Sequence, residues 1–199
     1  MMDMLIDLWL PILVSAVAIF ILSFVAWVVM PHHKTEWVKL PDEERFKEAI
    51  RGMNIPPGNY IFPGCAKGED MNSEAFKERY SAGPWGTLMV WRGQPSMGRN
   101  LALSFLVYFI ISVFVGYVGV LGAEPGMGFS EVFQITGTAA IMAYTFGALP
   151  GMIWFGATAK SFINHFADCI VYGAVTGAIF GWLWPAAASL PDALPAVGG

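Results

Sequence analysis

LWLPILVSAVAIFILSFVAWVVM, residues 8–30, is an uncharged and mostly apolar run, and PHHK, residues 31–34, follows it directly. A helix of about 20 apolar residues is long enough to cross the hydrocarbon layer of a bilayer. Three later stretches have the same character, namely 101–121, 132–153 and 162–184. The four stretches contain no Lys, Arg or Glu, and Asp168 is their only acid. The sequence therefore predicts an all-α integral membrane protein with four transmembrane helices.

The overall composition agrees with this class. Hydrophobic residues make up 56% and charged residues 13% of the 199-residue chain, whereas soluble domains contain about 25% charged residues. The first apolar run is too long for the core of a signal peptide, its leading flank carries no base, and no small-residue cleavage site follows it. We therefore expect residues 1–30 to remain in the protein as its first transmembrane helix.

The basic residues are distributed unevenly along the chain. All but one of the eleven Lys and Arg residues lie in 31–99, and the exception, Lys160, comes just before the fourth apolar stretch. Basic flanks of membrane helices are retained on the cytoplasmic side. With four spans, the flanks after the first helix, before the second and before the fourth all fall on one side. We therefore predict that 31–99 is cytoplasmic and that both termini face outward.

Residues 31–99 are predicted to form a small α+β insert between the first and second transmembrane helices. Their pattern predicts a helix, a strand, a second helix and a second strand, at 41–52, 59–62, 72–80 and 87–91. The two strands are expected to pair with each other. Bases and acids are nearly balanced here, so no nucleic-acid partner is indicated. The other parts are a three-helix transmembrane part, 100–185, and a C-terminal tail, 186–199.

One polar cluster stands at the start of the fourth apolar stretch. Lys160, Asn164 and Asp168 are spaced four residues apart and share a helical stripe, and His165 is three residues from Asp168. Asp168 lies about two turns inside the helix. An ionisable residue at that depth faces the bundle interior or water and is a functional candidate. We therefore regard these four residues as a candidate polar or ion site.

The predicted topology brings two further histidines to the same membrane face. His32 and His33 end the first helix on the side where His165 and Asp168 begin the fourth. Imidazoles and a carboxylate suit a divalent transition metal or a proton relay. The alternative is that the histidines lie at the interface and that Asp168 is a hydrogen-bonded structural carboxyl. No pair of helical histidines at metal-ligand spacing is present, and the pattern names no cofactor.

Small residues recur in the fourth stretch at Gly173, Gly177 and Gly181. In lipid this spacing lets two helix backbones approach closely. The glycines therefore indicate a packing seam, either within the four-helix bundle or between copies of the chain.

No sequence motif specifies a reaction. The glycine seam and the small insert favour a non-enzymatic, structural or accessory subunit of a membrane complex, whose partners are the lipid bilayer and either further copies of the chain or other membrane subunits. A small transporter or channel with Asp168, His165 and Lys160 at an inner vestibule is the alternative. A metal-dependent membrane enzyme that uses His32, His33, His165 and Asp168 is a third possibility.

Several short strings occur together along nearly the whole chain. They are VMPHHK (29–34), LPDE (40–43), PGNYIFP (57–63), GPWG (83–86), PSMG (95–98), IWFG (153–156) and FGWLWP (180–185). With these strings the chain resembles a family of small, uncharacterised bacterial inner-membrane proteins. It is more loosely similar to a four-helix membrane family of unknown function that lacks the insert. The resemblance implies a multi-pass protein of the bacterial inner membrane and supplies no activity or ligand set.

Overall fold

The computed structural model describes residues 2–65 and 68–187. Four helices are long and apolar enough to cross a membrane, namely Trp9–Val29, Met97–Gly122, Phe129–Trp154 and Ala159–Trp182. Each overlaps one of the four predicted apolar stretches, so the predicted number of such helices is confirmed. A small two-stranded sheet accompanies them. Insertion of the helices into a bilayer stays a prediction.

The first long helix changes its winding near its end. After the short α1 (Met2–Asp7), α2 (Trp9–Phe24) continues into η1 (Val25–Val29), a π-helical turn. Single π turns are frequent at functional sites. The chain then leaves the helix at Met30, whose extended backbone (φ −74°, ψ 148°) is the conformation favoured before the proline that follows.

The third apolar stretch, predicted as one helix over 132–153, is interrupted in the structure. It consists of α6 (Phe129–Thr145) and α7 (Leu149–Trp154), with a turn between them. Pro150 stands in the first turn of α7, where its missing N–H needs no partner, whereas an uninterrupted helix would clash with its ring. The prediction of one continuous helix was therefore wrong in this detail.

The other two long helices start slightly earlier than predicted because side chains cap them. Ser96 precedes α5 (Met97–Gly122) and accepts a hydrogen bond from the Arg99 amide. Thr158 precedes α8 (Ala159–Trp182) and accepts one from the Ser161 amide. Such caps satisfy amides that the first helical turn leaves without partners.

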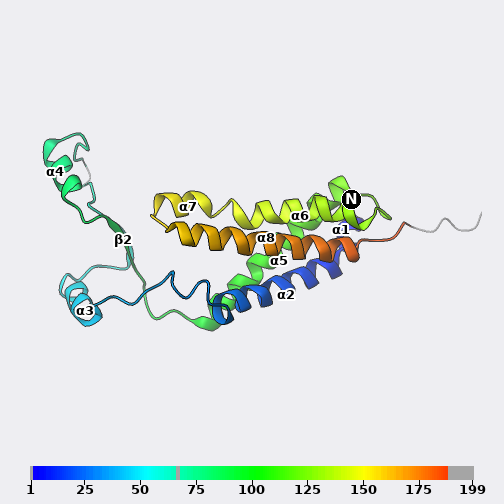
Figure 1. Cartoon of the computed structure of the whole chain (residues 1–199), viewed down its shortest axis with the longest axis horizontal. Coiled ribbons are helices and arrows are strands. Elements are labelled where there is room, and N and C mark those ends of the chain that lie inside the picture. The colour runs from blue at the N-terminus through cyan, green and yellow to red at the C-terminus, as the bar shows by residue number, and fades with distance from the viewer. Residues whose placement is uncertain (1, 66–67, 188–199) are drawn as a thin grey trace, which may run out of the picture.

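Helices α6 and α8 lie side by side in the bundle (Figure 1). A Cβ atom added to Gly177 would lie 2.7 Å from the Gly137 Cα atom, and one added to Gly173 would lie 2.8 Å from the Ile141 amide nitrogen. One added to Gly181 would lie 3.1 Å from the Phe129 carbonyl oxygen. Backbone at these distances leaves no room for a side chain. The glycine seam of α8 therefore packs against α6 within the same chain.

The insert contains the four elements that the sequence predicts. They are α3 (Glu43–Gly52), β1 (Gly58–Phe62), α4 (Glu74–Ala82) and β2 (Gly86–Val90). Asp42 and Ser73 cap the two helices through their side chains. The strands pair in antiparallel register, with Tyr60 opposite Leu88. The predicted strand pairing is confirmed.

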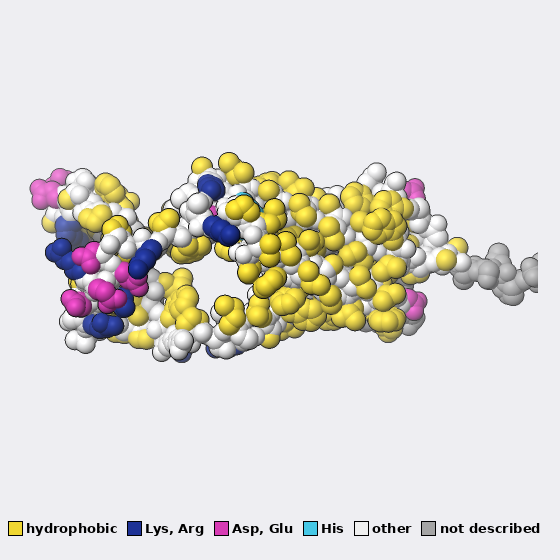
Figure 2. Space-filling view, turned by 60° about the horizontal axis from the view of Figure 1, so that its bottom comes forward, with side chains coloured by type: hydrophobic (Ala, Val, Ile, Leu, Met, Phe, Trp, Pro, Cys, Tyr) yellow, Lys and Arg dark blue, Asp and Glu magenta, His cyan; other side chains and the backbone are white. Residues whose placement is uncertain are grey.

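The insert projects from one end of the bundle, and the N-terminus lies near the other (Figure 1). We call the end of the bundle from which the insert projects the insert end. Figure 2 shows that apolar side chains cover the visible face of the bundle, whereas Lys and Arg lie in the insert and at the insert end. Acidic side chains mark the opposite end of this face. The surface therefore has the apolar band and polar ends that a membrane-spanning bundle requires.

Candidate functional site

Asp168 is held between two imidazoles at the insert end of the bundle. Its Oδ1 atom lies 3.1 Å from His32 Nε2 and its Oδ2 atom lies 2.8 Å from His33 Nε2. The His33 side chain is 5% exposed and that of Asp168 is 16% exposed. The meeting of these three residues, which the topology suggested, is thus present in the structure.

The two histidines are positioned by the segment that follows η1. The Lys34 amide donates to the Pro31 carbonyl and the Glu36 amide donates to the His33 carbonyl, so the segment folds into consecutive turns. The Trp27 indole, from η1, stacks on the His33 ring with centroids 3.9 Å apart and planes 4° apart. This stacking fixes the plane of the imidazole that faces Asp168.

Glu36 completes the arrangement on the far side of His33. Its Oε1 atom lies 2.7 Å from His33 Nδ1 and also accepts a hydrogen bond from Asn164 Nδ2 at 2.5 Å. Asn164 Nδ2 additionally donates to the His32 carbonyl at 2.9 Å. Burial acts to raise the pKa of the Glu36 carboxyl, but the hydrogen bonds from Asn164 and His33, with the charge of His33, lower the pKa below its usual value. Glu36 is therefore an ionised acceptor.

His33 consequently faces a carboxylate at each ring nitrogen. Because ionised Glu36 can only accept, Nδ1 carries a proton and donates it to Glu36. A neutral imidazole has a single N–H, so Nε2 would then point a lone pair at Asp168 Oδ2 from 2.8 Å. The contact requires either a second proton, held by His33 or Asp168, or a cation that both atoms bind.

The geometry suits a metal ion at this point. Among the described residues, His32, His33 and Asp168 each offer a ligand atom, and these atoms all lie within 4.8 Å of one another. Imidazole nitrogens with a carboxylate oxygen form a ligand set for zinc and other divalent transition metals. A histidine that binds a metal commonly donates its other N–H to a carboxylate, as His33 does to Glu36.

The remaining sequence candidates lie beside this group without joining it. His165 Nε2 lies 3.1 Å from the Thr145 carbonyl oxygen of α6, and the His165 ring contacts Cys169 Sγ at 3.8 Å. Lys160 Nζ donates to the Thr35 hydroxyl, and in the described part of the chain no hydrogen bond or ion pair joins it to Asp168. Of the four residues proposed as metal ligands, the structure thus brings three together and turns His165 toward α6.

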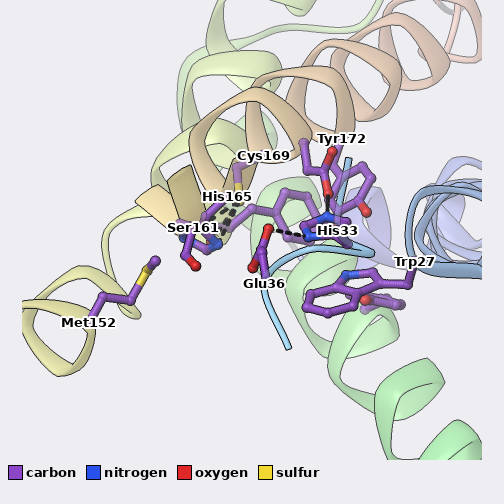
Figure 3. A pocket seen from close by; sticks show the side chains of 11 residues that line it. Trp27, His33, Glu36, Met152, Ser161, His165, Cys169 and Tyr172 are labelled. Atoms are coloured by element: carbon purple, nitrogen blue, oxygen red, sulfur yellow. Dashed lines mark hydrogen bonds and ion pairs between the residues drawn. The ribbon is translucent and has the colours of Figure 1, made fainter. Parts of the chain in front are cut away.

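A pocket of about 340 Å³ adjoins the cluster. Figure 3 shows Trp27, His33 and Tyr172 on one side of it and Ser161, His165 and Met152 on the other. Its remaining walls are Glu36, Tyr108, Tyr144, Asp168 and Cys169. The sequence did not indicate this pocket or the role of Glu36, although Glu36 is the first acid after the two histidines.

Comparisons with known proteins give no assignment. No family model, no curated protein and no solved structure matches the chain. The function is therefore inferred from the chemistry of the cluster and its pocket.

Proposed function

We propose that this chain is a metal-dependent membrane protein that binds one divalent transition metal ion through His32 Nε2, His33 Nε2 and an oxygen of Asp168. The supporting observation is the ring of His33, which faces a carboxylate at both nitrogens. A cation bound at Nε2 can take the place of a second proton in this contact, and it leaves Nδ1–H to Glu36. Glu36 then orients the histidine as carboxylates do behind other metal-binding imidazoles.

The number of protein ligands favours a site at which water or a substrate can also bind the metal ion. Structural zinc sites have four protein ligands, whereas catalytic ones have three and keep a position for water or substrate. His32, His33 and Asp168 supply three, and His33 and Asp168 also line the 340 Å³ pocket. Among the functions left open by the sequence, a metal-dependent membrane enzyme is the one that this geometry supports best.

Metal content tests this proposal directly. Full-length protein purified without chelator and given Zn²⁺ is expected to carry about one ion per chain, measured by native mass spectrometry, because three ligands hold zinc at catalytic sites. His33→Gln is expected to carry none after the same treatment. The matched control is His165→Gln, which alters a histidine of the same pocket outside the ligand group and should retain the ion.

Two outcomes would overturn the metal assignment. One is wild-type protein that binds no stoichiometric zinc, cobalt or manganese at any concentration that leaves it folded. The other is equal loss of metal from His33→Gln and His165→Gln. Either result would mean that the hydrogen bonds of the cluster have only a structural role, which is to hold the segment after η1 against α8.

An accessory role within a larger assembly has separate support from the insert. Trp37 and Val38 are each 82% exposed, and Trp85 and Trp91 are also largely exposed. Large exposed apolar side chains outside the apolar band favour a partner surface. We propose that further copies of the chain or another membrane subunit cover them. The native mass measurement should then give a species heavier than one 21.7-kDa chain, and a monomer in mild detergent would contradict it.

We further propose the orientation that the basic residues indicate, in a bacterial inner membrane with residues 31–99 cytoplasmic and both termini outward. Cys65 is exposed in the insert and Cys169 is buried. A maleimide that cannot cross membranes is expected to label Cys65 in inverted vesicles and to leave it unlabelled in intact cells. Slight desolvation and the Glu69 carboxylate raise the pKa of the Cys65 thiol, so labelling is done at about pH 8.5 to supply thiolate.

Cys65→Ser is the control for this labelling, because it leaves only the buried Cys169. Labelling of the wild-type protein in intact cells, absent from Cys65→Ser, would place the insert outside and reverse the proposed orientation.

A further inference from the structure

The pocket beside the cluster contains a donor that the protein itself does not use. The Tyr172 side chain is 7% exposed, and its hydroxyl has no hydrogen-bond partner in the described part of the chain. Tyr172 stands one helical turn beyond Asp168 and lines the pocket. A buried hydroxyl left without a partner costs about 1–3 kcal/mol. A molecule in the pocket that accepts this hydrogen bond would remove that cost.

The pocket is also close to an apolar groove. A second hollow of about 280 Å³ lies between α2–η1 and α5 and is lined partly by Phe20, Phe24 and Leu101. Trp27 and Tyr108 line both hollows. The groove is at the depth of the apolar band and its side chains are partly exposed, as Phe24 is at 50%. A molecule that extends past Trp27 and Tyr108 would reach the lipid.

The charged side chains that line the pocket indicate whether the head group of such a molecule is charged or neutral. Glu36 and Asp168 both line it, and each already faces the imidazole of His33. His165 is engaged by the Thr145 carbonyl oxygen. Without a bound metal ion, the pocket therefore has no unmatched positive charge for an anionic head group. The unpartnered donors among its described lining residues are the neutral hydroxyls of Tyr172 and Tyr144, which suit a neutral acceptor such as a carbonyl oxygen.

We propose that the pocket binds the neutral, carbonyl-bearing head of a membrane-soluble amphiphile, whose apolar tail lies in the groove between α2–η1 and α5. A volume of about 340 Å³ falls within the range of roughly 300–1,000 Å³ that is usual for small-molecule sites. Trp27 and the tyrosines give the head aromatic walls, and Tyr172 gives it a hydrogen bond. Two sources have this chemistry, an isoprenoid quinone and an acylglycerol.

Equilibrium titration of the full chain in detergent, after removal of metal with a chelator, tests the proposal and separates the sources. The probes are decylubiquinone, with a quinone head, monoolein, with a glycerol ester head, and oleate, which carries the oleoyl chain on an anionic carboxylate. One of the two neutral probes is expected to bind with a stoichiometry of one molecule per chain at saturation. The probe that binds shows whether the ligand is a quinone or an acylglycerol. Oleate is expected to bind at least about 10-fold more weakly than the neutral probe that binds, because two carboxylates line the pocket.

Two variants locate the bound molecule. Tyr172→Phe removes only the hydroxyl and is expected to weaken binding about 5- to 10-fold, the effect of one lost hydrogen bond. Ser104→Trp fills the groove, which Ser104 lines, and is expected to abolish binding. Tyr117→Phe is the matched control, because Tyr117 belongs to α5 and lines neither hollow.

The proposal is overturned if neither neutral probe saturates, or if binding is unchanged in both Tyr172→Phe and Ser104→Trp. Tighter binding of oleate than of monoolein would also overturn it, because that result requires an unmatched positive charge. Tyr172→Phe keeps the shape of the side chain, so it remains informative if Ser104→Trp fails to fold. None of the probes contains a metal, so a failed titration would leave the metal assignment standing.

Discussion

Asp168→Asn is expected to lower zinc affinity by more than about 100-fold. The substitution keeps the size of the side chain but removes the carboxylate that lies between His32 and His33. Loss of a group that merely supports a metal ligand costs about 10- to 100-fold in affinity, so loss of a ligand should cost more. The measurement is a zinc titration of the purified variant against wild type, with a competing chelator as indicator.

The same substitution separates a metal site from a purely structural carboxyl. At zinc concentrations 100 times its dissociation constant, a site gains about 2.7 kcal/mol of stability from bound ligand. Thermal unfolding of the wild-type protein should therefore shift upward on addition of zinc, and that of Asp168→Asn should not. If both proteins melt at the same temperature with and without zinc, Asp168 serves only to hold the segment after η1 against α8.

Glu36→Ala is expected to weaken zinc binding by about 10- to 100-fold without changing the number of ions bound at saturation. Glu36 accepts the Nδ1–H of His33 and does not belong to the three-residue ligand group. Its removal frees the imidazole to turn and lowers its basicity, which are the usual contributions of a carboxylate behind a metal-binding histidine. Glu36→Gln keeps an oxygen acceptor and should fall at the lower end of this range.

Glu43→Gln provides the matched control for Glu36. Glu43 is also an acid of the insert, but among the described residues its one ion pair is with Lys39 at the surface, 3.4 Å away. Its change should leave zinc affinity within about twofold because exposed pairs contribute little. A loss of ions at saturation in Glu36→Ala would show that Glu36 is itself a ligand. Equal affinity of Glu36→Ala and wild type would contradict the supporting role assigned to it.

The long helices could be predicted from the sequence because each depends on a local property. Around 20 uncharged, apolar residues are enough to specify a helix of spanning length, and each of the four stretches is helical, the third with a turn between α6 and α7. The break between α6 and α7 was missed because hydropathy does not register a turn. The sequence feature that indicates the break is Pro150, because a proline is tolerated in the first turn of a helix but not in its middle.

The cluster could be predicted only in part. His32 and His33 were placed near Asp168 because even numbers of spans return the chain to the same end of the bundle. His165 was included because it is three residues from Asp168, but those positions are about 60° apart around a helix. That rotation turns His165 to the Thr145 carbonyl oxygen of α6. Glu36 was missed because its contact with His33 depends on turns that no periodic pattern reveals.

X-ray absorption at the zinc edge of the full-length, zinc-loaded protein tests the metal site most directly. We expect scattering from two imidazole nitrogens at about 2.0–2.1 Å and from one or two oxygens at about 2.0–2.2 Å, with no sulfur. The imidazole signal should fall by half in His32→Gln, because His32 and His33 are the only histidines in the group. A sulfur ligand at about 2.3 Å, or a spectrum of hydrated zinc without imidazole, would contradict the proposed site.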